Sequence, residues 1–251
     1  MKQNIYDNEQ FFKGYEAIRT RKYNYNNLLE QPSFLKLVPD LKEKTVLDLG
    51  CGMGEFAFSC ISKGAKFVKG IDISTKMITV AKERYQHERL HFQINALEDM
   101  VLEGKHYDFI SSSLAFHYVA DFDALIKKIS AALNDDGVLL FSIEHPIVTA
   151  NKGGVDWQLG DEGNLLHFAV DYYQEQGKRT QNWLVNDVVT YHRTFSTIVN
   201  TLIEQDLQIE KICEPTPTKQ ALENGPYLQK EFRRPSFLII RARKKCLSQG
   251  Q

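Results

Sequence analysis

The stretch VLDLGCGMG, residues 46–54, decides how this chain folds. Val46, Leu47 and Leu49 are apolar residues that suit a buried strand, and Gly50, Gly52 and Gly54 follow at alternate positions before a helix-like run. Glycines are needed where the backbone takes a positive φ or comes close to a ligand. Asp48 is costly to bury without a hydrogen-bond partner, so we expect it at the end of the strand, facing a group that can donate hydrogen bonds. The stretch therefore predicts a strand, a glycine turn and a helix that together bind a ligand.

A second acidic residue, Asp72, ends the next predicted strand and follows the first loop glycine by 72 − 50 = 22 residues. In a nucleoside-binding βαβ unit, an acid about 20 residues on accepts hydrogen bonds from ribose hydroxyls. Dinucleotide sites prefer GxGxxG, whereas this loop reads GxGxG with an acid two residues upstream. That carboxylate would repel a pyrophosphate and suits an ammonium group. We therefore favour S-adenosylmethionine over a dinucleotide.

Five ordered runs resemble the motifs of the class I S-adenosylmethionine-dependent methyltransferases, in particular a small-molecule subgroup of the methyltransferase type 11 kind. They are VLDLGCGMG, then GIDIS at 70–74, INALED at 94–99, YDFISSSLAFHYV at 107–119 and LNDDGVLLFSIEHP at 133–146. YHRTF at 191–195 and RRPSFLIIRARK at 233–244 resemble the ends of that subgroup. The resemblance implies a Rossmann-like α/β fold with a seven-stranded, mostly parallel sheet, an antiparallel last strand and helices on both faces.

Alternating strand-like and helix-like runs from Thr45 onward agree with a parallel sheet covered on both faces. We predict strands at 45–49, 67–72, 90–94, 107–112, 137–144, 207–213 and 235–243, and helices at 54–62, 75–86, 121–133 and 195–205. Ser74 and Asp121 are expected N-caps. We expect residues 1–43 to form an N-terminal helical lid and residues 44–251 to form the methyltransferase domain, with a substrate-cap insertion at about 147–192.

The resemblance also implies a set of cofactor-binding residues. In resembling proteins a tyrosine and an arginine of the lid reach the methionine carboxylate, which points to Tyr15 with Arg21 or Arg19. Asn95 stands where the family usually has Asp, and its side chain is expected at the adenine edge. The remaining expected cofactor contacts are Asp48, Gly50, Cys51, Gly52, Gly54, Asp72, Ile73, Met77, Ala96, Leu97, Ser112, Ser113 and His117.

Polar residues after the fourth and fifth strands are the catalytic candidates, because ligands of open α/β sheets lie at the carboxyl ends of strands. They are His117, Glu144 and His145, as a base, as substrate ligands or as structural hydrogen-bonding groups. The chain reads SSSL at 111–114, where methyltransferases that act on amide or exocyclic base nitrogens have Asn/Asp-Pro-Pro-aromatic. Methylation of such nitrogens is therefore not expected.

The insertion is expected to determine which acceptor is bound, since a long connection after a cleft strand is commonly a lid or binding element. The substrate candidates are Tyr118, Trp157, Tyr191, His192 and Arg193. Arg193 suits a carboxylate or phosphate of the substrate, or alternatively a surface salt bridge.

Composition narrows the class of function. The 251 residues carry a net charge of −1, which gives no general attraction to nucleic acid. The N-terminus has no apolar signal region, and no apolar run is long enough to span a bilayer, so we expect a cytoplasmic protein that does not bind membranes. The four cysteines form no metal motif. We expect a monomer or homodimer without a metal.

These observations predict a methyltransferase that moves the methyl group of S-adenosylmethionine to a small or medium-sized molecule by in-line displacement, leaving S-adenosylhomocysteine. Two alternatives stay open. One is a non-catalytic, regulatory module that binds the cofactor. The other, less favoured, is an NAD-dependent oxidoreductase, for which the chain lacks both GxGxxG and a catalytic Tyr/Lys pair.

Overall fold

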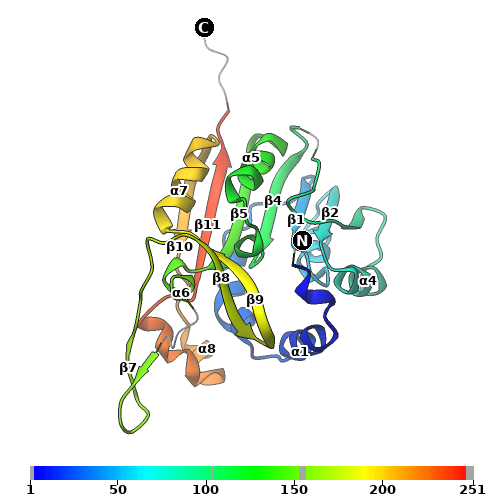
Figure 1. Ribbon diagram of the computed structural model, residues 1–251. Coiled ribbons are helices and arrows are strands. Elements are labelled where there is room, and N and C mark those ends of the chain that lie inside the picture. Colours follow the sequence, from blue (N-terminus) through cyan, green and yellow to red (C-terminus); the bar gives the residue numbers. More distant parts are fainter. Residues whose placement is uncertain (1–2, 103, 153–156, 247–251) are drawn as a thin grey trace.

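The computed structural model describes residues 3–102, 104–152 and 157–246 and is built on a seven-stranded sheet (Figure 1). Its strands are β1 (Thr45–Leu49), β2 (Phe67–Asp72), β3 (Leu90–Ile94), β4 (Tyr107–Ser113), β5 (Leu133–Glu144), β10 (Leu207–Cys213) and β11 (Phe237–Lys244). They lie in the order β10-β11-β5-β4-β1-β2-β3. The pairs among β1 to β5 are parallel, whereas β11 is antiparallel to both β5 and β10. The predicted Rossmann-like sheet with an antiparallel last strand is confirmed.

Four helices alternate with the strands, close to their predicted bounds. They are α3 (Glu55–Ser62), α4 (Thr75–Arg84), α5 (Phe122–Ala132) and α7 (Phe195–Glu204). The two predicted N-caps are confirmed, because Ser74 accepts from the Met77 N–H and Asp121 from the Ala124 N–H. Between β10 and β11 the chain forms α8 (Lys219–Asn224) and a 3₁₀ segment, η4 (Pro226–Phe232).

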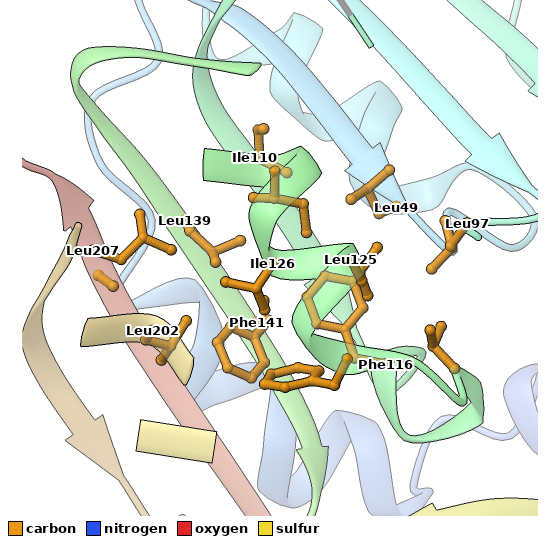
Figure 2. Close-up of a cluster of buried hydrophobic side chains, with 14 of the residues drawn as sticks. Leu49, Leu97, Ile110, Phe116, Leu125, Ile126, Leu139, Phe141, Leu202 and Leu207 are labelled. Carbon is orange, nitrogen blue, oxygen red and sulfur yellow. The ribbon is translucent and has the colours of Figure 1, made fainter. Parts of the chain in front are cut away.

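Hydrophobic side chains pack on both faces of the sheet, since successive residues of a strand point to opposite faces. On one face Leu49 and Phe141 pack in a cluster that includes Leu125 of α5 and Leu202 of α7 (Figure 2). The other face carries a second cluster, which includes Val46, Phe109, Leu140, Phe34, Ala57 and Ile78. The two clusters hold the sheet between them, so that the carboxyl ends of the parallel strands lie together at one edge.

The N-terminal segment lies across this edge. It contains η1 (Ile5–Asp7), α1 (Glu9–Arg19), a π-helical turn η2 (Asn26–Glu30) and α2 (Gln31–Leu35). Asp7 accepts hydrogen bonds from the Ser74 hydroxyl at 2.6 Å and the Lys76 N–H at 3.1 Å, so it caps the start of α4. These contacts fasten η1 to the half of the sheet that carries β2.

The region after β5 forms α6 (Pro146–Thr149) and two hairpins, β6 (Trp157–Leu159) with β7 (Leu165–Phe168) and β8 (Gly177–Trp183) with β9 (Val185–His192). Residues 153–156 of the predicted insertion lie outside the described residues. The tip of the β8–β9 hairpin reaches α1 (Figure 1), where the Trp183 and Phe11 ring centroids are 5.2 Å apart. Among the described residues, no helix has the length and apolar character needed to cross a membrane.

Candidate active site

A cavity of about 950 Å³ lies at the carboxyl ends of β1, β2, β4 and β5. The N-terminal segment and the tip of the β8–β9 hairpin complete its wall. The cavity thus lies where open α/β sheets bind their ligands. The predicted site residues that line it are Tyr15, Arg21, Asp48, Gly50, Cys51, Gly52, Asp72, Met77, Ser113, His117, Tyr118 and Glu144.

The glycine loop between β1 and α3 needs all three of its glycines. Gly50, Gly52 and Gly54 have φ values of 71°, 52° and 85°, in the left-handed region that favours glycine. A Cβ on Gly50 would lie 2.4 Å from the Cβ of Ala115, and one on Gly54 would lie 2.6 Å from a ring carbon of Phe92. Around Gly52, none of the described atoms comes within 4 Å of the Cβ position. Gly52 therefore leaves open space beside the backbone on the cavity wall.

Asp72 is buried at the end of β2 and is joined to this loop. One carboxylate oxygen accepts the Gly52 N–H and the other accepts the Ser74 N–H, each at 2.9 Å. Burial raises the pKa of the carboxyl group, and the two backbone donors oppose that shift. Because a carboxylate offers about four acceptor positions, Asp72 retains capacity for ligand hydroxyls.

Asp48, at the end of β1, is only 3% exposed. Burial raises its pKa to about 7, while a 2.9 Å hydrogen bond from the Ser111 hydroxyl lowers it and the charge of Asp72 raises it further. A cation bound nearby would favour the ionised carboxylate. Asp48 and Asp72 therefore form a negative pocket beside the glycine loop.

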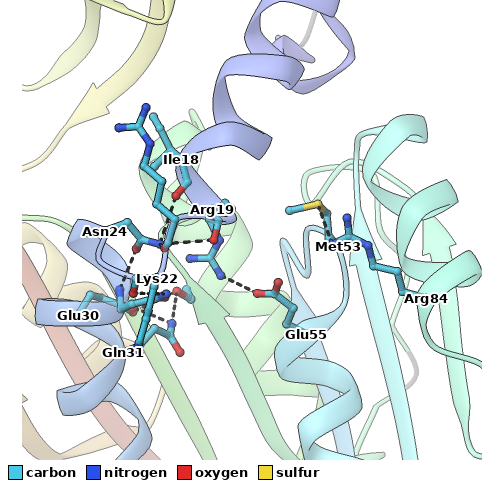
Figure 3. A network of polar contacts seen from close by, with 12 residues as sticks. Ile18, Arg19, Lys22, Asn24, Glu30, Gln31, Met53, Glu55 and Arg84 are labelled. Carbon is cyan, nitrogen blue, oxygen red and sulfur yellow. Dashed lines mark hydrogen bonds and ion pairs between the residues drawn. The ribbon is translucent and has the colours of Figure 1, made fainter.

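Two arginines of the N-terminal segment line the cavity, in different settings. The Arg19 side chain is 16% exposed and its Nη2 lies 2.8 Å from Oε2 of Glu55, across the space between α1 and α3 (Figure 3). Tyr15 and Arg19 lie four residues apart in α1, where side chains share one face of the helix. Burial raises the pKa of the Tyr15 hydroxyl, and the charge of Arg19 lowers it. Arg21 is exposed. Of the two predicted arginines, Arg19 is the one held beside Tyr15.

The β4 turn, which we define as residues 113–115, forms another part of the wall. Leu114 has a φ of 54°, a conformation that costs a non-glycine residue about 1–2 kcal/mol. Its N–H donates to the carbonyl oxygen and the hydroxyl of Ser142, at 3.0 and 3.1 Å. Neighbouring bonds between β4 and β5 therefore hold the turn in this strained form.

His117 follows the β4 turn in η3 (Phe116–Tyr118) and lines the cavity with Glu144. Its Nδ1 accepts the backbone N–H of Glu144 at 3.5 Å, which assigns the proton to Nε2. Burial lowers its pKa to about 3, and the charge of Arg193 acts in the same direction. His117 is therefore neutral at physiological pH. It suits the role of a hydrogen-bond donor better than the expected role of a base.

Comparisons with known proteins identify the family. A family model for the methyltransferase domain matches residues 46–137. An S-adenosylmethionine dependent methyltransferase from Mesorhizobium loti is 34% identical, with 85% of this chain and 97% of that chain covered and a TM-score of 0.80. This chain is a class I S-adenosylmethionine-dependent methyltransferase. A Listeria monocytogenes protein of known structure is 41% identical over 86% of this chain and 97% of its own, with a TM-score of 0.82.

A third relative is a Ubiquinone biosynthesis O-methyltransferase from Coxiella burnetii. It is 33% identical to this chain over 104 residues, which cover 41% of this chain and 44% of the relative. Because the family and its solved members depend on S-adenosylmethionine, this enzyme uses that cofactor, and neither the regulatory module nor the oxidoreductase describes it.

The residues at the loop fit the cofactor. Gly52 leaves open space for a ligand, and Asp72 has hydrogen-bond acceptor positions that remain available. An ammonium group would stabilise the ionised carboxylate of Asp48. When bound, S-adenosylmethionine supplies an already activated methyl group. The chain's own groups then have to bind it, orient the acceptor and exclude water. Among the described residues, no three His, Cys, Asp or Glu side chains are grouped to hold a metal ion.

His145 has a structural setting in the methyltransferase. Its Nε2 lies 2.9 Å from Oε1 of Glu214, and its Nδ1 accepts the Ile147 N–H at 3.2 Å as the N-cap of α6. Burial lowers its pKa, and Glu214 opposes that shift. It does not belong to the described lining of the cavity. The predicted role as a base needs a free ring nitrogen at the cavity, and both nitrogens already have protein partners.

The predicted substrate residues of the insertion also have protein partners. Arg193 donates to the Val119 carbonyl and, at 3.0 Å, to that of Ala120. His192 is fully buried between the Thr149 hydroxyl and the Tyr173 carbonyl, both at 2.8 Å. These bonds hold β9 in place. The structure therefore assigns neither side chain to the described cavity wall.

Tyr191 and Trp157 likewise lie away from the large cavity. Tyr191 and Arg193 line a separate cavity of about 10 Å³, behind His117 and Glu144. Trp157 packs against Phe168, and the guanidinium carbon of Arg233 lies 4.9 Å from its ring centroid. Of the five substrate candidates, Tyr118 alone belongs to the described lining of the large cavity.

Six other predicted cofactor contacts lie near the strand ends without lining the cavity. The Asn95 N–H donates to the Asp72 carbonyl at 2.9 Å, which places the loop after β3 beside β2. Ser112 is fully buried in β4. These roles in adenine and cofactor binding stay predictions. The six residues are Gly54, Ile73, Asn95, Ala96, Leu97 and Ser112.

Several cavity residues were missed in the sequence. Trp183 belongs to the β8–β9 hairpin, and Tyr6 precedes α1. The Tyr6 ring centroid lies 5.1 Å from that of Tyr15 and 6.1 Å from that of Tyr118. Tyr227 and Phe237 come from the C-terminal part. An aromatic residue at a hairpin tip was the available signal for Trp183, whereas the others require the fold.

Proposed function

We propose that this methyltransferase transfers the methyl group of S-adenosylmethionine to a small or medium-sized molecule by in-line displacement. The observation that carries the proposal is one cavity shared by the glycine loop and by the ends of β4 and β5. Its volume of about 950 Å³ lies at the upper end of the range of small-molecule sites, about 300–1,000 Å³. Cofactor and acceptor are therefore expected to meet in one cavity.

The cofactor half of the cavity is assigned to the glycine loop and its neighbours. Asp72 would accept from the ribose hydroxyls, Asp48 would face the ammonium group, and Tyr15 with Arg19 would bind the carboxylate. The burial and contacts of these side chains support the proposed roles. The resemblance supports the role of Tyr15 with Arg19, because a tyrosine and an arginine of the lid reach the methionine carboxylate in resembling proteins.

The acceptor half is assigned to the ends of β4 and β5. His117 and Glu144 would hold the polar group of the acceptor, with His117 as a neutral donor. Tyr118, Trp183 and Phe237 supply aromatic surface to the cavity. Such a wall suits an acceptor with an apolar or planar part. The similarity to an enzyme of ubiquinone biosynthesis supports a small-molecule acceptor.

The test begins with cofactor binding. Isothermal titration with S-adenosylhomocysteine is expected to show micromolar affinity that falls at least tenfold in Asp72→Ala, and NAD is expected not to bind. The enzyme is then supplied with S-adenosylmethionine and either a small-metabolite extract, total protein or total RNA. Formation of S-adenosylhomocysteine above the Asp72→Ala background is expected with the small metabolites. Turnover confined to the protein or RNA fraction would overturn the proposed acceptor class.

A further inference from the structure

Glu30 is a fully buried acid to which neither the sequence motifs nor the proposed chemistry gives a role. It ends η2 in the N-terminal segment, more than 80 residues before the strands that it touches. A buried carboxylate is unfavourable unless hydrogen bonds satisfy it, and burial accordingly raises the pKa of Glu30. A chain does not retain such a group in its interior without compensating contacts.

The hydrogen bonds of Glu30 lead mainly to the β4–β5 side of the cavity, and the charge of Arg19 also acts on its carboxyl group and lowers the pKa. Oε1 accepts from the hydroxyls of Ser142 at 2.6 Å and Ser113 at 3.1 Å. Oε2 accepts from the Gln31 side chain at 2.7 Å, and the same amide group donates to Ser113 at 3.2 Å (Figure 3 shows Glu30 beside Gln31). Glu30 acts as the acceptor in each of these bonds, as a carboxylate does.

The chain of bonds continues to the strained backbone of the β4 turn. Ser142 donates its hydroxyl proton to Glu30 and uses the same oxygen to accept the Leu114 N–H at 3.1 Å. Glu30 thereby fixes the rotamer in which Ser142 can receive that N–H. Leu114 lines the cavity in a left-handed conformation, and Ala115 next to it touches the glycine loop. A side chain of the N-terminal segment therefore helps to set the wall between the two halves of the cavity.

We propose that Glu30 is a positioning residue for methyl transfer, which acts through Ser142 to hold the β4 turn beside the cofactor. Glu30 itself lies outside the described lining of the cavity and would not touch either ligand. Displacement reactions depend steeply on the alignment of the reacting atoms, and a site is precise only when neighbouring hydrogen bonds lock its wall. The inference extends the proposed function but its first test needs no acceptor.

The test uses Glu30→Gln, Ser142→Ala and the double variant that carries both changes. Each is compared with a control variant, Asp108→Asn. Asp108 is the matched control, because its carboxylate accepts from the Thr45 N–H at 2.8 Å and the Asn134 side chain at 3.0 Å, at the opposite edge of the sheet. Thermal unfolding, S-adenosylhomocysteine affinity and the NMR resonance of the Leu114 amide in ¹⁵N-leucine-labelled enzyme are recorded for each.

Glu30→Gln and Ser142→Ala are each expected to shift the Leu114 amide resonance, with the double variant adding no further shift, because both changes break one chain of bonds. The affinity for S-adenosylhomocysteine is expected to change less than twofold. Asp108→Asn should lower the unfolding temperature without moving the Leu114 resonance. An unmoved resonance in Glu30→Gln, or an equal shift in the control, would overturn the proposal. If Glu30→Gln does not fold, Glu30→Asp, whose shorter side chain withdraws the carboxylate from Ser142, takes its place with the same expected shift.

Turnover supplies the second readout once the metabolite screen yields an acceptor. Glu30→Gln is expected to lower kcat at least tenfold with the KM for S-adenosylmethionine unchanged, whereas Asp108→Asn keeps both. A fall in kcat that only matches the folded fraction would show that Glu30 is merely structural. If the screen yields no small acceptor, the proposed function fails while the Leu114 measurement still judges the role of Glu30.

Discussion

A Cβ placed on Gly50 would lie 2.4 Å from the Cβ of Ala115, so the two residues touch at a distance that only a glycine permits. Gly50 opens the loop after β1, and Ala115 belongs to the β4 turn. The loop assigned to the cofactor and the turn assigned to the acceptor are thus packed directly against each other. At this contact the loop and the turn have no room for a larger side chain at position 50.

The Gly50→Ala substitution is expected to destabilise the fold and abolish cofactor binding. The positive φ costs about 1–2 kcal/mol and overpacking against Ala115 about 1–3 kcal/mol more. Gly163→Ala is the control, because Gly163 has a φ of 77° but no described atom within 4 Å of its Cβ position. Chemical unfolding should show the larger loss for Gly50→Ala. Equal losses would mean that the Ala115 contact yields easily.

Cofactor binding is expected to tighten as the pH rises from 6 to 8. Burial raises the pKa of Asp48 to about 7 in the free enzyme, and the bound ammonium group would favour the ionised carboxylate, so binding releases a proton. The affinity should increase by up to about tenfold per pH unit below pH 7. Titration of S-adenosylhomocysteine in buffers of different ionisation enthalpy measures both effects. Asp48→Asn should remove the pH dependence, and a flat profile in the unaltered enzyme would contradict the assignment.

The free enzyme is expected to lose folding stability as the pH rises from about 4 to about 7. A carboxyl group whose pKa is raised on folding contributes stability when protonated, below its ordinary pKa of about 3.9. That contribution is lost as the pH rises toward about 7, the pKa in the folded state. Asp48→Asn should therefore show a smaller decline in unfolding temperature between pH 4 and 7 than the unaltered enzyme.

Arg19, rather than Arg21, is expected to bind the cofactor carboxylate. Arg19 is mostly buried beside Tyr15, whereas Arg21 is exposed, and a hydrogen bond to a charged group contributes about 1.5–3 kcal/mol. Arg19→Gln should weaken S-adenosylhomocysteine binding about tenfold or more, and Arg21→Gln less than twofold. Titration calorimetry on the two variants compares them directly. The reverse order would move the carboxylate to the outer end of the lid segment.

Trp183 is expected to report ligand binding by its fluorescence. The chain has two tryptophans, and Trp183 lines the cavity while Trp157 packs on Phe168. In Trp157→Phe, addition of S-adenosylhomocysteine should change the emission of Trp183 because the ligand alters its surroundings. In Trp183→Phe the signal of Trp157 should stay constant. A response confined to Trp157 would place the ligand near the β6–β7 hairpin instead.

The sheet was predictable because apolar runs alternate regularly with helical ones, and the predicted strand at 207–213 is β10 unchanged. The start of β5 was missed. The prediction placed Leu133 in a helix and began the strand at Gly137, yet β5 begins at Leu133. The register with β4 shifts between Tyr107 and Phe109, and Asp136 takes a φ of 63°. An irregularity of this kind absorbs turn-like residues within a strand.

The candidate site was only partly predictable. Asp48, Asp72 and the glycines are fixed by local spacing, so their place in the cavity follows once the strands are known. His145, His192 and Arg193 lie near the same edge, but each is held by a partner from a distant segment, such as Glu214 for His145. Glu30 gave no local signal, because Ser113 and Ser142 are remote in the sequence.

The contact between α1 and the β8–β9 hairpin has a consequence for altering acceptor choice. Trp183 packs against Phe11 and Tyr15, and a Cβ on Gly14 would lie 3.0 Å from the Leu184 side chain. A hairpin redesigned for a bulkier acceptor would collide with the helix unless α1 changed as well. If the hairpin binds the acceptor as proposed, a change of acceptor requires paired substitutions in two segments that lie more than 150 residues apart.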